Sequence, residues 1–477
     1  MSSFKPHSQP TNPEGDTALA TQQVSTEQLE AAVRGAVITP GDSRYDDARR
    51  VYNAQIDKRP AVIVQCVDDA DVAATVNFAR DNDLGLSIRG GSHNPNGFAV
   101  NDDGVVIDLR LMNSVHVDPA TKTVRVQGGC VWGDVDHATH QFGLAVPSGI
   151  ISTTGVAGLA LGGGIGYLTR KAGLTCDNLI SADVITADGN RLTASANEND
   201  DLYWALRGGG GNFGVVTSFE FQAHDVHTVF GGPFFYDVKK GPEVMKLFRD
   251  FIMDAPDDMT AFFAYLIVPP ADPFPTELQN KTVAAIICAW TGPLEKGPEM
   301  TQPLRDFGPP LMDGTAEVPF PALNSAFDGL VPEGLQHYWK ADFVDDLTDP
   351  LIATHAKHGP NIPTFESAMH IYPVNGAAHR VGKTDTAWSY REANFTHVIA
   401  AMFPDPADTD ANREWVRNYW DELSPNSSGG AYVNFMHEED QERIKASYRD
   451  NYDRLARVKA KYDPSNLFHM NQNIQPA

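Results

Sequence analysis

Three glycine-rich segments constrain the fold of this chain more than any other feature of its sequence. They read SIRGGSHNPNG at residues 87–97, GIISTTGVAGLALGGGIG at 149–166 and RGGGGNFGVVTSFEF at 207–221. Glycine lets the backbone adopt conformations that side chains forbid and lets it approach a bulky group closely. The middle segment carries no charged residue, which is unusual for a surface loop. The pattern favours backbone packed against a flat, buried ligand.

The regions around these segments predict a mixture of helices and strands. The stretch 68–91 reads as a helix followed by a short strand that leads into the first glycine segment, and alternating valines in 114–129 predict a hairpin. Near residue 225 glycine gives way to proline and to strand-like runs such as MTAFFAYLIVPP, so we expect a domain boundary there. A single C-terminal helix is predicted from apolar residues at helical spacing, namely Ile444, Tyr448, Tyr452, Leu455, Val458 and Tyr462.

Charge and cysteine content exclude several classes of function. The 477 residues carry 37 basic and 62 acidic side chains, a net charge of −25, which disfavours nucleic acid and anionic membranes as partners. The four cysteines have no paired spacing and no H-x-x-x-H or H-E-x-x-H motif appears, so neither a disulfide framework nor a metal is expected. Residues 1–37 contain no secretory signal, so we expect a disordered or extended tail and a cytoplasmic protein.

One apparent nucleotide-binding motif has the wrong context. Gly209, Gly211 and Gly214 satisfy the spacing G-x-G-x-x-G, which binds a dinucleotide only between a strand and the helix that it opens. Here a helical segment, DDLYWALR, precedes the glycines and a strand, VVTSFEF, follows them. This reversed order argues against an NAD-linked dehydrogenase of the Rossmann type.

The glycine segments, together with Y-x-N at Tyr432–Asn434 and N-Q-N-I at Asn471–Ile474, resemble the vanillyl-alcohol-oxidase superfamily of flavoproteins. The resemblance is to its berberine-bridge-enzyme-like branch. It implies an α+β fold with a PCMH-type, two-subdomain FAD-binding domain over 38–225, completed by the C-terminal segment 431–477. Residues 226–430 are then expected to form a substrate domain, an antiparallel sheet covered by helices.

The same resemblance assigns the FAD site. His93 matches the histidine that bonds covalently to the flavin 8α carbon, and a neutral imidazole, with a reference pKa near ~6.5, suits that nucleophilic role. Many relatives add a cysteine tether where Ile151 stands here, so FAD is expected to be attached through His93 alone. The other residues expected to bind FAD are Arg89, Gly90, Gly91, Ser92, Asn94, Thr153, Thr154, Gly155, Gly158, Gly162, Gly166, Val216, Asn434 and Asn471.

The residues that act on the substrate are less constrained by the sequence. Relatives place a tyrosine of the Y-x-N segment over the flavin, and the segment FESAMHIYP at 365–373 presents alternate residues on one face of a strand. The catalytic candidates are Glu366, His370, Tyr372, Tyr432 and Asn434. Histidine suits a general base at neutral pH, whereas a tyrosine with a reference pKa near ~10 requires a large depression. The identity of the base therefore stays open between them.

The resemblance implies an FAD-dependent oxidase. A C–H bond next to an alcohol or amine of a small molecule would give a hydride to flavin N5, and O2 would then accept the electrons and yield H2O2. The substrate is a sugar, an aromatic alcohol, an alkaloid or another secondary metabolite, and the protein is expected to be a monomer or homodimer. A flavin-dependent oxygenase or oxidative cyclase of natural-product biosynthesis, and a non-catalytic flavin- or drug-binding protein, remain alternatives.

Overall fold

The structure is a computed structural model that describes residues 25–477. Most of the predicted tail, residues 1–24, lies outside the described residues. The remainder differs from that prediction, because residues 25–37 contain helix α1 (Glu27–Ala32) and the start of strand β1 (Ala36–Ile38). Leu29 of α1 is only 2% exposed and packs in the same apolar cluster as Val72 and Val76. The burial of Leu29 accounts for the order of this segment.

The first sheet delivers the first glycine segment. Its strands run in the order β1, β2 (Val62–Gln65), β4 (Val105–Asp108), β3 (Leu86–Arg89), and all but β1 are parallel. Helix α3 (Asp69–Asp81) connects β2 to β3 and starts at Asp68, whose side chain accepts hydrogen bonds from two backbone amides of the first turn. The predicted helix and strand over 68–91 are confirmed. The glycine segment follows β3 directly, at the carboxyl edge of the parallel strands.

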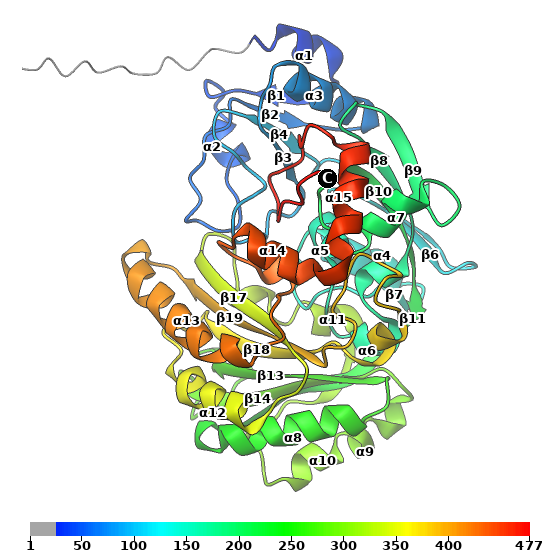
Figure 1. The fold of residues 1–477 in the computed structure, drawn as a ribbon. Coiled ribbons are helices and arrows are strands. Elements are labelled where there is room, and N and C mark those ends of the chain that lie inside the picture. The colour runs from blue at the N-terminus through cyan, green and yellow to red at the C-terminus, as the bar shows by residue number, and fades with distance from the viewer. Residues whose placement is uncertain (1–24) are drawn as a thin grey trace, which may run out of the picture.

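The third glycine segment leads directly into strand β10 of the second sheet, and the middle segment contains helix α5 (Figure 1). This sheet is antiparallel, in the order β5, β6, β10, β8, β9, and β5 with β6 forms the predicted hairpin. Helix α7 precedes the third glycine segment and β10 follows it, which is the order predicted from the sequence and the reverse of that in a Rossmann fold. The elements of this part are α2 (Tyr45–Ala48), β5 (Val115–Asp118), β6 (Thr123–Gln127), α4 (Trp132–His140), β7 (Leu144–Ala145), α5 (Val156–Gly162), α6 (Thr169–Ala172), β8 (Leu179–Ile185), β9 (Arg191–Ser195), α7 (Asp200–Leu206), β10 (Val215–Gln222) and β11 (His224–Asp225).

A large antiparallel sheet forms the rest of the molecule, beyond the expected boundary at residue 225. Its order is β15, β12, β14, β13, β18, β19, β17, with β16 paired to β12. Helices α8, α12 and α13 cover one face (Figure 1). The elements are β12 (Thr228–Asp237), α8 (Gly241–Asp254), β13 (Met259–Ile267), β14 (Thr282–Trp290), α9 (Gly297–Met300), α10 (Gln302–Asp306), β15 (Met312–Asp313), β16 (Ala316–Pro319), α11 (Phe320–Asn324), β17 (Gln336–Val344), α12 (Asp349–His358), β18 (Ala368–Pro373), β19 (Phe395–Phe403) and α13 (Thr409–Leu423).

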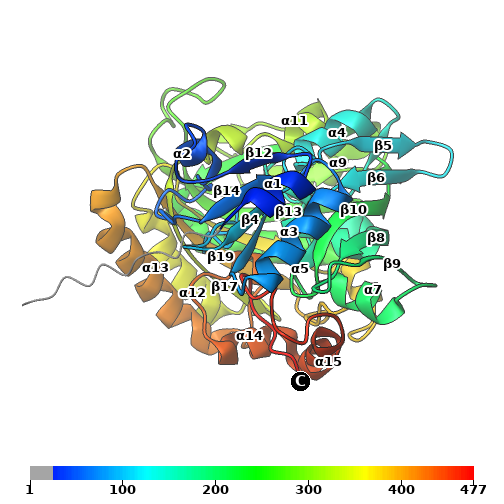
Figure 2. The same cartoon turned by 90° about the horizontal axis from the view of Figure 1, so that it is seen from above.

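The C-terminal segment returns to the first half of the chain. The predicted single helix is wrong in one respect, because it is two helices, α14 (Gln441–Tyr448) and α15 (Tyr452–Tyr462), separated at Arg449, whose φ is 47°. The Asn451 side chain donates to three carbonyls of residues 383–387, and these tertiary bonds accompany the break. Helix α15 lies beside α7 in both views (Figures 1 and 2). Among residues 25–477 no helix is long and apolar enough to cross a membrane.

Candidate active site

A cavity of about 370 Å³ lies between the glycine segments and the helix-free face of the large sheet. Strand β18 shows how the sheet builds it. Met369 and Ile371 pack under the covering helices, whereas Ala368, His370 and Tyr372 point to the cavity, as the period-two alternation predicts. The cavity is lined by these residues of the predicted site: Gly90, Gly91, Ser92, His93, Asn94, Thr154, Gly155, Gly158, Val216, Glu366, His370, Tyr372, Tyr432, Asn434 and Asn471.

Four residues predicted to contact FAD are not among those that line the cavity. Arg89 is 3% exposed and its guanidinium donates to the carbonyl of Ala48, so it braces the loop from behind. Thr153 contacts His93 through its hydroxyl. Side chains at Gly162 and Gly166 would place a Cβ 2.1 Å from an oxygen of Asn434 and of Ser148, respectively. Gly162 and Gly166 therefore allow the segments behind the cavity to pack closely against each other.

The loop that carries His93 is held by contacts that only glycine permits. A Cβ on Gly91 would lie 2.3 Å from the amide nitrogen of Gly155, and Ser92 has a φ of 53°, in the left-handed region. The imidazole of His93 then sits with Nε2 3.2 Å from the hydroxyl of Thr153 and Nδ1 3.5 Å from that of Thr154. Burial lowers the pKa of His93 to about 4, so the ring is neutral and nucleophilic at neutral pH.

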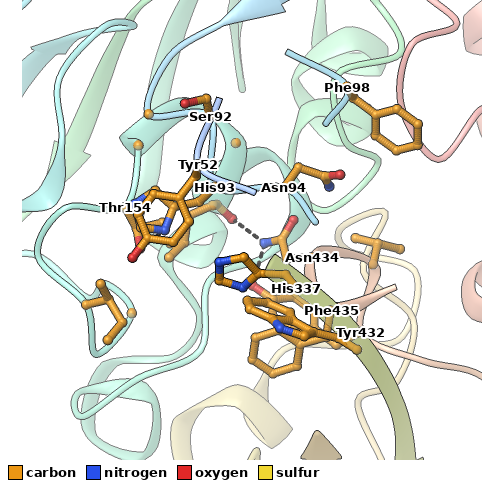
Figure 3. A pocket seen from close by; sticks show the side chains of 18 of the residues that line it. Tyr52, Ser92, His93, Asn94, Phe98, Thr154, His337, Tyr432, Asn434 and Phe435 are labelled. Atoms are coloured by element: carbon orange, nitrogen blue, oxygen red, sulfur yellow. Dashed lines mark hydrogen bonds between the residues drawn. The ribbon is translucent and has the colours of Figure 1, made fainter. Parts of the chain in front are cut away.

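Three aromatic side chains beside His93 were missed by the sequence analysis. The ring of Tyr52 stacks on the His93 imidazole at 3.7 Å between centroids, and His337 of β17 is the next ring (Figure 3). Trp339 of β17 also lines the cavity. Tyr52 lies well before the first glycine segment and β17 lies far after it. No local pattern distinguishes these residues from ordinary core residues, so only the fold brings them to the site.

Tyr432 lies in the wall of the cavity, and its hydroxyl oxygen accepts two hydrogen bonds from the protein. The phenolic oxygen accepts hydrogen bonds from the amide of Gly164 at 2.7 Å and from Nδ2 of Asn434 at 2.6 Å. Burial raises the pKa of Tyr432, despite these two bonds, so the phenol stays protonated at neutral pH. Of the two candidate bases left open by the sequence, the tyrosine is thus the poorer one.

His370 and Tyr372 form a hydrogen-bonded pair on the sheet side of the cavity. His370 Nδ1 lies 2.6 Å from the Tyr372 hydroxyl, and the pair is packed against Phe262 and Phe327. Burial lowers the pKa of His370 to about 4 and raises that of Tyr372, so both groups are neutral at pH 7. With Nδ1 engaged, Nε2 is the ring nitrogen left to exchange a proton with a bound molecule. Glu366 also lines the cavity, just before β18.

Comparison with known proteins gives the family. Residues 60–195 match the FAD binding domain model and residues 431–475 match the model described as berberine and berberine like. An FAD-linked oxidoreductase of Dictyostelium discoideum is 30% identical over 473 residues, which cover 97% of this chain and 99% of that protein. The (R)-6-hydroxynicotine oxidase of Paenarthrobacter nicotinovorans is 31% identical over 462 residues, covering 93% and 97%.

The chain belongs to the berberine-bridge-like FAD-linked oxidoreductases.

Solved structures share the architecture of this chain over most of its length. That of 6-hydroxy-D-nicotine oxidase from Arthrobacter nicotinovorans superposes with a TM-score of 0.83 at 29% identity, covering 93% of this chain and 98% of the other. A glucooligosaccharide oxidase from Acremonium strictum, described with a 6-S-cysteinyl, 8α-N1-histidyl FAD, gives 0.83 at 22% identity, covering 94% and 98%. The α+β fold predicted from the sequence, with its PCMH-type domain and antiparallel sheet, is confirmed.

The cavity of this berberine-bridge-like oxidoreductase fits FAD. An added Cβ on Gly158 or Gly211 meets no described atom within 4 Å, which leaves room for a ligand along both glycine segments. Successive backbone amides in such loops suit a pyrophosphate. Three polar atoms of lining residues are buried without a partner among residues 25–477, namely His337 Nε2, Trp339 Nε1 and Asn471 Oδ1. A dinucleotide with a polar ring system would satisfy donors and acceptors that the protein leaves free.

Proposed function

We propose that this FAD-linked oxidoreductase is an oxidase. It would remove a hydride from a carbon next to an alcohol or amine of a small molecule and use O2 as the electron acceptor, with H2O2 as the product. FAD supplies the hydride acceptor and the reaction with O2. One observation carries the proposal. A neutral His370–Tyr372 pair stands on the sheet side of a cavity that is also lined by a neutral His93.

His370 is the group that would take the substrate proton. Its Nε2 is free, and a pKa of about 4 keeps the imidazole unprotonated at neutral pH. In this role Nδ1 carries the ring hydrogen and donates it to the Tyr372 hydroxyl oxygen, which fixes the orientation of the ring and leaves the lone pair on Nε2. A substrate O–H or N–H in contact with Nε2 would pass its proton to His370 while the neighbouring C–H bond breaks. The charge that develops on the imidazole is then shared with the hydroxyl of Tyr372.

We further propose that FAD is attached through His93 alone. A ring nitrogen of His93 would form a bond to the 8α carbon, one C–H bond and one N–H bond would be lost, and the two electrons would pass through the flavin to O2. Ile151 lies in the cavity wall and has no thiol to form a second bond. The neutral state of His93, which follows from its burial, supports this role.

The chemistry of the cavity favours a flat, largely apolar substrate. Phe327, Trp339 and Phe435 line it together with aliphatic residues such as Leu266 and Val398. Polar contacts are available at few points, of which the His370–Tyr372 pair is one. An alcohol or amine whose reacting carbon is attached to an aromatic ring would match this surface better than a sugar, which needs many hydrogen-bonding partners. We propose substrates of this class. We also propose that the protein is cytoplasmic and is a monomer or a homodimer.

A peroxide-coupled screen tests the proposed oxidase function. Purified holoprotein is offered aromatic alcohols, cyclic and aromatic amines and sugars, and O2 consumption, H2O2 and product are measured together. One H2O2 per product, with aromatic substrates preferred, is the expected result. Incorporation of oxygen from O2 into the product would instead establish the oxygenase alternative. FAD that stays oxidised in anaerobic mixtures with every compound would favour a flavin-binding protein without turnover.

A further inference from the structure

The segment Val51–Ala54 is wedged between the two halves of the molecule, next to His93. The hydroxyl of Tyr52 donates to the carbonyl of Val331, and the amide of Ala54 donates to the carbonyl of Leu335 at 2.9 Å. Asn53, which is 1% exposed, donates through Nδ2 to the carbonyl of Pro95 at 2.7 Å. The segment is therefore fixed both to the strand region around β17 and to the loop that carries His93.

This fixed segment holds one face of the His93 imidazole. The Tyr52 ring is 7% exposed and lies 3.7 Å from the imidazole, with 23° between the two planes. Its other neighbour is His337, at 5.4 Å between ring centroids. The two ring nitrogens of His93 meet the hydroxyls of Thr153 and Thr154. The imidazole is thus contacted on one face and at both nitrogen atoms, which restricts its rotation about the Cβ–Cγ bond.

We propose that Tyr52 is the positioning residue for the covalent attachment of FAD to His93. The inference rests on the proposed tether. Bond formation needs a nitrogen lone pair aimed at the carbon that it attacks, and loss of such alignment by about 1 Å costs up to roughly 10²-fold in rate. Burial holds the His93 ring neutral, but neutrality alone does not orient it. The stacked tyrosine ring supplies the orientation, and its burial keeps it from turning with the imidazole.

The test follows attachment itself rather than turnover. The wild type, Tyr52→Leu and Tyr52→Phe are expressed with limited riboflavin and then incubated with FAD and O2. Total bound FAD is read from absorbance, and acid-stable flavin from the fluorescence of the denatured polypeptide. Tyr45→Leu is the matched control, because Tyr45 is 4% exposed in the cluster that also contains Val51, whereas the ring that stacks on His93 is that of Tyr52.

The expected result separates stacking from general stability. Tyr52→Leu binds FAD but attaches it about tenfold more slowly, whereas Tyr52→Phe, which keeps the stacked ring, and Tyr45→Leu attach it within about twofold of the wild-type rate. Equal rates for Tyr52→Leu and the wild type would overturn the proposal, as would an equal loss in Tyr45→Leu or a loss in Tyr52→Phe as large as that in Tyr52→Leu. If Tyr52→Leu does not fold, Tyr52→Met takes its place in the same comparison. A wild type without acid-stable flavin would refute the tether itself.

Discussion

The contact between Gly91 and Gly155 gives the sharpest quantitative prediction. Gly155 has a φ of −64°, which alanine also adopts, so the effect of Gly155→Ala is purely steric. Its Cβ would lie 2.4 Å from the amide nitrogen of Gly91, whereas an ordinary contact begins at 3.4 Å. The two glycine segments must therefore separate by about 1 Å, which is the difference between these two distances. Overpacking of this kind costs about 1–3 kcal/mol.

Gly158→Ala, in the first turn of helix α5 after Gly155, is the matched comparison. An added Cβ there meets no described atom within 4 Å, and alanine in helix α5 gains about 1 kcal/mol of helix propensity over glycine. The methyl group would, however, enter the space that we assign to FAD. We therefore expect Gly155→Ala to lower the melting temperature of the protein with and without FAD, and Gly158→Ala to weaken FAD binding without destabilising the protein.

Differential scanning calorimetry and FAD titration separate these effects. A loss of about 2 kcal/mol corresponds to a fall of roughly 4–8 °C in melting temperature for a domain of 150–250 residues. Gly155→Ala should also slow attachment of FAD, since Gly91 is two residues from His93. A melting temperature for Gly155→Ala equal to that of the wild type would refute the argument from close packing. Unchanged FAD affinity in Gly158→Ala would show that the ligand does not lie along α5.

Two further predictions concern the histidines. His370→Phe keeps an aromatic ring beside Phe262 and Phe327 but removes the proposed base. Anaerobic flavin reduction by the best substrate should therefore slow by about 10²–10⁴-fold, while the amount of acid-stable FAD stays unchanged. A change in the rate below tenfold would assign the base to another residue. His337 is 1% exposed, and burial, with the nearby His93 and His437, lowers its pKa to about 3. The unfolded chain therefore takes up a proton below pH ~6.5 that the folded chain does not, and stability falls as pH drops from there towards 3. Between pH 7.5 and 5, the free energy of unfolding of His337→Gln in urea should fall by about 2 kcal/mol less than that of the wild type. Parallel curves of unfolding free energy against pH for the two proteins would contradict this.

Local patterns predicted those parts of the fold in which neighbours in sequence decide the structure. The helix and strand over 68–91, the hairpin of β5 and β6 and the alternation along β18 are of this kind, and each follows from a repeat of apolar residues. The reversed order around Gly209 was equally readable, because it needs only the type of the flanking elements. In these cases burial on one face is sufficient to select the conformation.

Tertiary contacts decided the features that the sequence analysis missed. Tyr52 and His337 meet across 285 positions, where the side-chain amide of Asn53 bonds to the backbone of His337, and nothing in either local sequence indicates that encounter. Helix α1 is ordered by the burial of Leu29, and the C-terminal helix is interrupted where Asn451 bonds to residues 383–387. The guanidinium of Arg89 donates to the carbonyl of Ala48, a contact that no local pattern indicates. Each of these depends on a partner that no local pattern specifies.

The most direct test of the account is the chemical state of His93 in the purified protein. Holoprotein is precipitated with acid and digested with trypsin, and the peptide of residues 90–110 is analysed by mass spectrometry. We predict that this peptide is yellow and heavier by one FAD less two hydrogens, and that His93→Ala yields flavin wholly released by acid. A colourless wild-type precipitate, or an FAD adduct on a peptide without His93, would contradict the account.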